Sequence, residues 1–227
     1  MSANDDILAE CDKIQTSVDT IRNLLKTPPV LQHGAEGIDV SLYQANINWV
    51  QVKASGKAFA FIKATQGVDI TDPYWAANWA GAKAAGLPRG AYHYYKNNAD
   101  PVAQANFFCM KLLADKGELQ PVVDIEDTSS LPNGAQIKQF LDAVENTLKV
   151  KPIIYTGKWF WDSPRYGNLG AQVTWESQYD LWVADYTTNA EPALPGGWVS
   201  YKFRQYSSSG RVSGISANVV DLDRYNG

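Results

Sequence analysis

Short apolar runs, separated by polar segments and turns rich in glycine and proline, dominate the chain from residue 37 onward. Strand-like runs are expected at residues 37–41, 58–64, 90–95, 121–126, 152–156, 181–186, 201–206 and 219–223. Helical periodicity is clearest at 74–85, 101–116 and 136–149. Strands alternating with helices predict parallel pairing in an α/β barrel. Because only loops separate the last three strands, the pattern favours a shortened, irregular TIM-like barrel with a few helix-less strands.

The first 36 residues follow a different pattern. Apolar residues recur there at spacings of four, three, four, three and four, namely Ile7, Cys11, Ile14, Val18, Ile21 and Leu25. This pattern predicts a separate helix over 1–27, a linker over 28–36 that starts at Pro28-Pro29, and a barrel over 37–227. Three heptads are marginal for an independent coiled coil. The helix could form a homo-oligomer or attach the chain to a larger particle, dock on the barrel, or fray.

The composition narrows the class of protein. With 227 residues, 45% of them hydrophobic, the chain can bury one large core or a core plus a small appendage. Residues 1–36 carry six acids and three bases, which leaves the remainder at a net charge of −1. A nearly neutral body argues against a nucleic-acid partner. No apolar run approaches the roughly 20 residues of a membrane span, and no secretory signal is visible at the start.

The apolar run at 121–126 contains two acids, Asp124 and Glu126. Side chains at i and i+2 of a strand point to the same side, with backbones about 6 to 7 Å apart. Repulsion at that distance is worth roughly 2.5 kcal/mol at an effective dielectric near 20, so one carboxyl is expected to stay protonated beside a charged one. Cleavage of a glycosidic bond requires such a pair. The alternative, two solvated acids in a turn, fits poorly with Val122, Val123 and Ile125, which favour burial.

Further acids fall near other strand ends: Asp39, Asp185 and Asp221. In parallel barrels, reactive groups gather at the carboxyl ends of the strands. Each acid alone could be a cap, a turn residue or a partner of Lys63 or Arg204. Together with Asp124 and Glu126, however, they indicate an acidic site at one end of the barrel.

Other chemistries lack their motifs. The only histidines are His33 and His93, and no paired-histidine spacing for zinc and no EF-hand loop occurs, so we predict neither a metal nor a cofactor. GxSxG and P-loop motifs are absent as well. The two cysteines do not suggest a disulfide framework.

Many aromatic residues lie beside the expected strand ends. They include Tyr43, Tyr92, Tyr94, Tyr155, Trp159, Trp182, Tyr186 and Tyr206. Sugar rings stack their C–H faces on aromatic rings, and sugar hydroxyls hydrogen-bond to tyrosine and tryptophan edges. The pattern therefore predicts a sugar-binding groove, although any one of these rings could instead belong to the barrel core.

From residue 37 onward the chain resembles glycoside hydrolase family 25, the N-acetylmuramidases. The resemblance rests on fragments in the family's order: Gly37-Ile38-Asp39-Val40-Ser41, Tyr43-Gln44, Trp49, Phe61-Ile62-Lys63-Ala64-Thr65, Gly90-Ala91-Tyr92-His93-Tyr94, Asp124-Ile125-Glu126, Tyr155-Thr156, Trp182-Val183-Ala184, Gln205-Tyr206-Ser207 and Val220-Asp221-Leu222. It implies a barrel of about five βα units finished by three strands. It also implies hydrolysis of the β-1,4 bond between N-acetylmuramic acid and N-acetylglucosamine in bacterial peptidoglycan.

The resemblance also implies roles for individual residues. Glu126 would be the general acid, with Asp124, Asp39 and Asp221 as the supporting acids. Tyr92, Tyr155, Trp182 and Gln205 would hold sugar, and we add Tyr186 from the aromatic pattern. We expect the substrate's own 2-acetamido group to attack, oriented by Asp124, with net retention; direct attack by Asp124 is the alternative.

Two positions depart from the family's pattern. Gln66 stands where family members often have glutamate, and Arg204 stands where the common Trp-Gln-Tyr-Ser has tryptophan. Neither position is one of the acids. The two differences therefore bear on the specificity of the groove rather than on catalysis. Competing interpretations are a non-catalytic wall-binding module and a structural phage component. Without a visible signal, we expect synthesis in the cytoplasm and action on the wall after release, as a phage lysin or a virion component.

Overall fold

The computed structural model describes residues 7, 10, 11, 13–15, 17, 18 and 31–227. It separates into a unit at 1–30 and a unit at 31–227. The described residues of the first unit are helical, and its Ile7 and Ile14 are 61% and 59% exposed. Ile21 and Leu25 of the expected heptad pattern lie outside the described residues.

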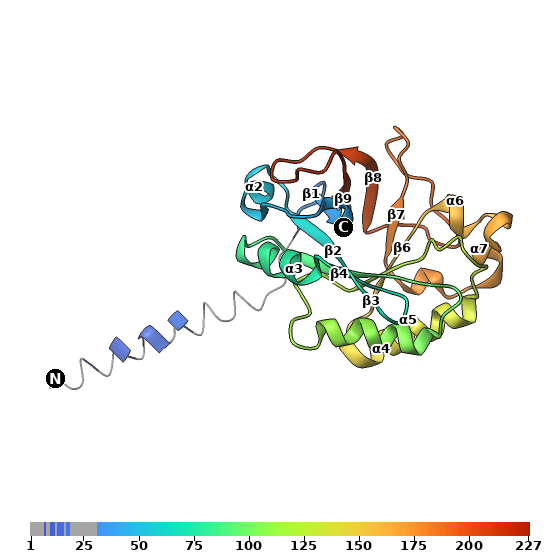
Figure 1. Ribbon diagram of the computed structural model, residues 1–227, viewed down its shortest axis with the longest axis horizontal. Coiled ribbons are helices and arrows are strands. Elements are labelled where there is room, and N and C mark those ends of the chain that lie inside the picture. Colours follow the sequence, from blue (N-terminus) through green and yellow to red (C-terminus); the bar gives the residue numbers. More distant parts are fainter. Residues whose placement is uncertain (1–6, 8–9, 12, 16, 19–30) are drawn as a thin grey trace. The chain divides into compact units, whose positions relative to one another are not determined.

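Within residues 31–227, eight strands close into a barrel (Figure 1). They are β1 (Glu36–Val40), β2 (Phe59–Gln66), β4 (Arg89–Tyr94), β5 (Val122–Asp124), β6 (Ile153–Thr156), β7 (Leu181–Ala184), β8 (Phe203–Gly210) and β9 (Val220–Tyr225). Pairing is parallel from β1 through β2 and β4 to β8, and antiparallel where β9 joins β8 and β1. The two-residue β3 (Ile70–Thr71) extends β2 as a hairpin. The expected irregular TIM-like barrel is confirmed.

Helices cover the outside of the barrel and follow the early strands. They are α2 (Trp49–Ala54), α3 (Trp75–Ala84), α4 (Pro101–Leu112), α5 (Gly134–Leu148), α6 (Lys158–Trp161) and α7 (Leu169–Gln172). Three 3-10 turns lie at Leu42–Gln44, Pro164–Tyr166 and Glu176–Gln178. As expected, no helix separates β7, β8 and β9 in this described part of the chain. The sequence pattern did not predict α2, α6 and α7, because helices of four to six residues carry little periodicity.

Helix α5 begins two residues before its expected start because Asn133 caps it. The Asn133 side chain accepts the backbone N–H groups of Ala135 and Gln136 at 3.0 and 3.2 Å. At the other end, Lys149 adopts a left-handed conformation with φ of 57° and terminates the helix. None of the helices in the described residues is long and apolar enough to cross a lipid bilayer.

Alternation along the strands separates two apolar layers. In β2, Phe59 and Phe61 point into the barrel, whereas Ala60 and Ile62 pack outward against the helices. The inner cluster consists of Phe59, Phe61, Tyr92, Val122, Ile153, Tyr155, Trp182, Ala184 and Phe203. Glycine makes room for these rings: a Cβ on Gly37 would lie 2.3 Å from Phe59, and one on Gly90 would lie 2.5 Å from Phe61. The inner cluster therefore fills the barrel interior below the carboxyl ends of the parallel strands.

The segment at 31–36, expected to be linker, makes contacts within the barrel unit. The backbone N–H of Gly34 donates to the carbonyl of Tyr225 at 2.8 Å, and His33 Nδ1 lies 2.6 Å from the carbonyl oxygen of Asn226. Leu31 packs against the inner cluster, and Glu36 already belongs to β1. Residues 31–36 therefore belong to the unit at 31–227.

Candidate active site

A cavity of about 530 Å³ opens at the rim where the parallel strands end. The four acids expected at the site, Asp39, Asp124, Glu126 and Asp221, all line it. So do the five residues expected to hold sugar, Tyr92, Tyr155, Trp182, Tyr186 and Gln205. The remaining lining residues are Ser41, Tyr43, Lys63, Gln66, Tyr94, Lys96 and Ser208. The structure therefore brings these nine residues into one place.

Strand periodicity explains why polar groups appear at this level of the barrel. In β2, the alternation that turns Phe59 and Phe61 inward also turns Lys63 inward, one step nearer the rim. In β5, Val122 is followed on the same face by Asp124 and then by Glu126. Each inward face therefore changes from apolar to polar as its strand reaches the opening.

Glu126 lies two residues beyond the end of β5, although we expected the strand to continue through it. The backbone N–H of Ile125 still donates to the carbonyl of Tyr155 at 2.9 Å. Thr156 Oγ1 donates to the carbonyl of Ile125 at 2.8 Å. These two bonds to β6 hold the chain beyond the strand, so Glu126 keeps its place at the cavity beside Asp124.

Asp221 reaches the same rim because β9 runs in the opposite direction. The seven parallel strands end at the rim, whereas the antiparallel β9 begins there, and Asp221 is its second residue. Asp39 and Asp221 are paired across β1 and β9. Asp223, two residues further along β9, is fully buried below the cavity and accepts the indole N–H of Trp182 at 3.0 Å.

Gln205 connects the aromatic and acidic sides of the cavity. Its side-chain oxygen accepts the hydroxyl groups of Tyr155 and Tyr186 at 2.8 and 2.6 Å. Its amide nitrogen donates to Asp39 Oδ2 at 2.7 Å. Both ends of the amide are therefore used, and the network fixes the orientation of two rings and one carboxyl group.

The carboxyl groups at the cavity hold their protons more tightly than ordinary ones. Burial, with a smaller contribution from the charge of Asp221, raises the pKa of Glu126 to about 7, while Lys63 opposes the rise. Burial raises the pKa of Asp221 to about 6. Near neutral pH, both protonation states of Glu126 are thus populated. Glu126 can therefore donate a proton and afterwards take one up again.

The pKa of Asp124 is raised as well. Burial and then the charge of Glu126 raise the pKa of Asp124 well above its usual range, against the opposing influence of Lys63. The expectation was that partial burial and the charge of Asp124 keep Glu126 protonated; burial is the larger cause, and the neighbouring charge that raises the pKa of Glu126 is that of Asp221. The sequence predicted the interaction between Asp124 and Glu126. It did not predict that β9 brings Asp221 near Glu126.

Two lysines, which we did not expect at the site, lie among these acids. Lys63 Nζ donates to Gln66 Oε1 at 2.8 Å and lies 4.8 Å from the centre of the Tyr94 ring. Burial lowers the pKa of Lys63, while the charges of Asp124, Asp72 and Glu126 oppose the change. Lys96 pairs with Asp127 at 2.6 Å. Lys63 could have been recognised from its position two residues after Phe61.

Asp185, also considered as a site acid, does not line the cavity. Its carboxylate accepts the backbone N–H groups of Thr187 and Ala193 at 2.8 and 2.7 Å, so it organises the loop after β7. Arg204 supports the same loop by donating to the carbonyl oxygens of Asp185, Thr187, Asn189 and Ala190. The loop carries Tyr186 to the cavity.

Two of the rings expected beside the strand ends also lie elsewhere. Tyr206 donates to Glu36 at 3.1 Å, and Trp159 does not line the cavity. His93 is fully buried between Thr65 and Gln104, and burial lowers its pKa to about 3, so it is a neutral structural residue.

Known proteins share this sequence and this architecture. The family model described as glycosyl hydrolases family 25 matches residues 38–215. The chain is 34% identical to lysozyme M1 of Streptomyces globisporus over 215 residues, which cover 88% of this chain and 70% of that protein. It is 29% identical to an N,O-diacetylmuramidase of Chalaropsis sp., covering 82% of this chain and 93% of that protein.

Solved structures agree. A bacterial lysozyme from Streptomyces coelicolor superposes with a TM-score of 0.71 at 33% identity, covering 87% of this chain and 94% of that one. A family 25 lysozyme from Aspergillus fumigatus gives a TM-score of 0.71 at 26% identity, covering 85% and 94%. With a closed barrel, an acidic rim cavity and these matches, the chain belongs to glycosyl hydrolase family 25 and is a glycoside hydrolase.

Proposed function

We propose that the chain is a muramidase that hydrolyses the β-1,4 bond between N-acetylmuramic acid and N-acetylglucosamine in bacterial peptidoglycan. The observation that carries the proposal is Glu126, a carboxyl group with a pKa of about 7 in a cavity lined by aromatic rings and further acids. The chain's similarity to lysozyme M1 and to the N,O-diacetylmuramidase of Chalaropsis supports the choice of polysaccharide.

In this mechanism, protonated Glu126 donates to the glycosidic oxygen while positive charge develops on the sugar ring. Asp221 supports the donor by raising the pKa of Glu126. Tyr92, Tyr155 and Trp182 form the floor of the cavity and offer flat surfaces to the sugar. Asp39 is held in place by the side-chain amide of Gln205.

We infer that the substrate's 2-acetamido group attacks the anomeric carbon. Asp124 Oδ1 is buried and has no hydrogen-bond partner among the described residues, so it is available to accept the acetamido N–H. A hydrogen bond from the acetamido N–H to this oxygen would orient the acetamido group toward the anomeric carbon. Because Asp124 and Glu126 project from one segment to the same side, they do not flank the bond as a separate nucleophile and acid would.

Mass spectrometry of digested peptidoglycan tests the proposal. New fragments should end in reducing N-acetylmuramic acid, and a defined oligosaccharide should yield a product with retained anomeric configuration. Glu126→Gln should keep the fold and lose about 100-fold or more in rate. Reducing N-acetylglucosamine ends would contradict the bond assignment, and binding without any cleavage would favour a wall-binding module.

We propose that the barrel unit is sufficient for hydrolysis, and that the first unit assembles copies of the chain or attaches it to a phage particle. Exposed Ile7 and Ile14, seven residues apart, support an apolar seam. Light scattering after size exclusion should give a larger assembly for the full chain than for one starting at Leu31, with equal rates per barrel. Equal masses would contradict self-assembly. We propose that the enzyme acts on the cell wall after release from the producing cell.

A further inference from the structure

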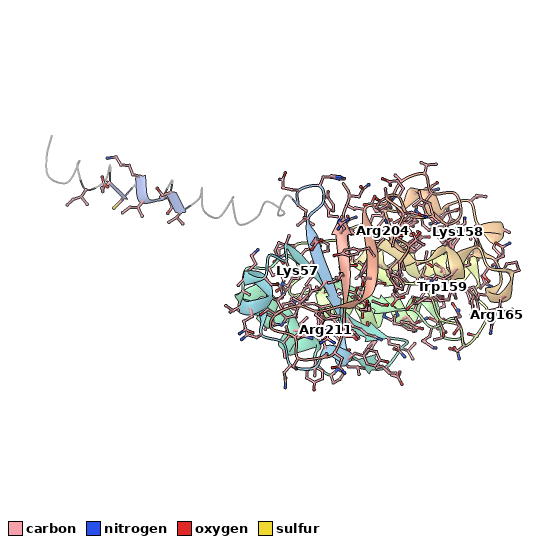
Figure 2. All side chains as sticks on the ribbon, turned by 90° about the horizontal axis from the view of Figure 1, so that it is seen from above. Lys57, Lys158, Trp159, Arg165, Arg204 and Arg211 are labelled. Atoms are coloured by element: carbon pink, nitrogen blue, oxygen red, sulfur yellow. The ribbon has the colours of Figure 1, made fainter. Side chains whose placement is uncertain are left out.

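Trp159 is a large apolar side chain in an exposed position that the cavity does not explain. It belongs to α6, directly after β6, and it is 50% exposed. Figure 2 shows Trp159 with Lys158 and Arg165 in the same part of the barrel unit, in α6 and the turn that follows it. Half-exposed indole rings are uncommon, because tryptophan is largely buried in most proteins.

The surroundings hold this ring in a fixed orientation. Its edge-to-face neighbours are Phe160, with ring centres 5.7 Å apart, and Tyr166, with ring centres 5.8 Å apart and planes at 89°. On the remaining side it lies over Gly157, where a Cβ would stand 2.4 Å from Trp159 Nε1. Because residue 157 has no side chain, the indole ring can pack directly against its backbone. We call this position over Gly157 the seat of the indole.

This seat adjoins the rim of the cavity. The same Cβ position on Gly157 lies 3.1 Å from the carbonyl oxygen of Ala184, so Trp159 is next to the end of β7. Two residues later, the loop reaches Tyr186, which lines the cavity and is itself 53% exposed. On the other side, Gly157 directly follows the strand that carries Tyr155 into the cavity.

We propose that Trp159 is a sugar-stacking platform outside the catalytic cavity, which binds a more distant residue of a β-1,4-linked amino-sugar strand as that strand leaves the cavity past Tyr186. The proposal rests on the muramidase function proposed above. A polymer longer than the cavity must cross the rim, and a fixed, half-exposed ring beside Tyr186 continues the aromatic surface. The platform would add affinity for long strands without touching the bond that is cut.

Kinetics on peptidoglycan glycan strands, freed of peptides and fractionated by length, test this proposal. Trp159→Ala should raise KM for long strands roughly tenfold, the equivalent of about 1.4 kcal/mol of binding, and leave kcat unchanged. For the shortest strand that is cut, KM should stay the same. Trp159→Phe should retain most of the affinity, because a smaller ring still offers a stacking face.

Gly157→Ala provides a second variant that keeps the indole. The added methyl group must push the ring aside, so KM for long strands should rise while the barrel stays folded. Phe107→Ala, which removes a ring from the outer helix α4, is the matched control and should change neither value. Equal effects on short and long strands, or no effect on either, would overturn the platform.

A binding measurement separates this proposal from the proposed function. Titration calorimetry with a chitin hexasaccharide and a disaccharide should show a loss of roughly tenfold in affinity for the longer sugar alone in Trp159→Ala. Suppose that the wild-type chain binds the hexasaccharide more tightly than Trp159→Ala does but releases no reducing muramic acid from peptidoglycan. The muramidase assignment then fails and the platform stands. If it cleaves normally and Trp159→Ala binds both sugars like the wild type, the platform alone is wrong.

Discussion

Asp39 and Asp221 lie opposite each other where β1 and β9 pair, although 182 residues separate them in the chain. This antiparallel contact closes the barrel and at the same time brings the acid of β9 against Glu126. Closure of the barrel and the electrostatics of the site therefore depend on the same pair of strands. Several properties of the enzyme should change when this arrangement is altered.

The first prediction concerns the alkaline limb of the pH profile. Activity should fall as pH rises through about 7, because Glu126 then loses the proton that it donates. Asp221→Asn removes a negative charge that raises the pKa of Glu126, so the limb should move to lower pH. Rates measured across the acidic to alkaline range and normalised for each variant will show the shift. Asp142→Asn, on the outer helix α5, removes the same charge elsewhere and should leave the limb in place.

The second prediction concerns Gln66, which bonds to Lys63 through a neutral amide. Lys63 lowers the pKa of Glu126 and of Asp124. Gln66→Glu would place an anion beside that lysine and offset its charge, so the alkaline limb should move to higher pH by up to roughly one unit. Gln139→Glu, on the exposed side of α5, is the matched control. A shift to lower pH would contradict this account of Lys63.

The third prediction concerns Arg204 and the loop after β7. Its guanidinium donates to four backbone carbonyl oxygens, at 2.7 to 3.1 Å, in the loop that carries Tyr186. Arg204→Met keeps much of the length of the side chain but removes these bonds, and it should destabilise the protein by about 1.5 to 3 kcal/mol. KM should rise more than kcat falls, because the loop positions sugar rather than the proton donor. Arg211→Met removes an exposed arginine and should change neither the stability of the protein nor KM. An unchanged KM in Arg204→Met would show that Tyr186 holds its place without the arginine.

The fourth prediction concerns how the stability of the fold depends on the protonation of Asp223, the fully buried acid of β9. Burial and then Asp221 raise the pKa of Asp223 well above its usual range. Asp223 Oδ2 is buried and has no hydrogen-bond partner among the described residues. A raised pKa in the folded state means that the fold is most favoured while Asp223 is protonated. Stability is then lost as pH rises from the unfolded pKa near 4 through the higher folded value.

An asparagine in place of Asp223 has no such proton to lose, yet its amide oxygen can still accept the Trp182 indole N–H. Asp223→Asn should therefore be more stable than the wild type in mildly alkaline buffer, and the two should converge toward a pH of about 4. The difference should grow by about 1.4 kcal/mol for each unit of pKa shift. Urea unfolding at a series of pH values measures it. A constant difference across the range would mean that Asp223 is not the titrating group.

The sequence was sufficient to predict the barrel because its apolar alternation is regular and its strands are well spaced. The resemblance to family 25, together with the rule that reactive groups gather at the carboxyl ends of parallel strands, placed the four acids and five sugar-binding candidates at one rim. Asp221 reaches that rim for a different reason, because the antiparallel β9 begins there. Lys63 was considered only as an ion-pair partner of single acids, because a lone lysine near the end of an apolar run is typical of a strand end at the surface. The contribution of Asp221 to the raised pKa of Glu126, which adds to the larger effect of burial, was not predicted either. The position of Asp221 follows from the direction of β9, and no local pattern encodes a strand's direction.

The late position of β9 has a consequence for biosynthesis. Until residues 220–225 have emerged from the ribosome, a nascent chain lacks the strand that closes the barrel. It also lacks the carboxyl group that pairs opposite Asp39. Premature termination before this point leaves fragments without a finished catalytic centre. A cell that makes this enzyme is therefore exposed to its activity only through products translated past β9.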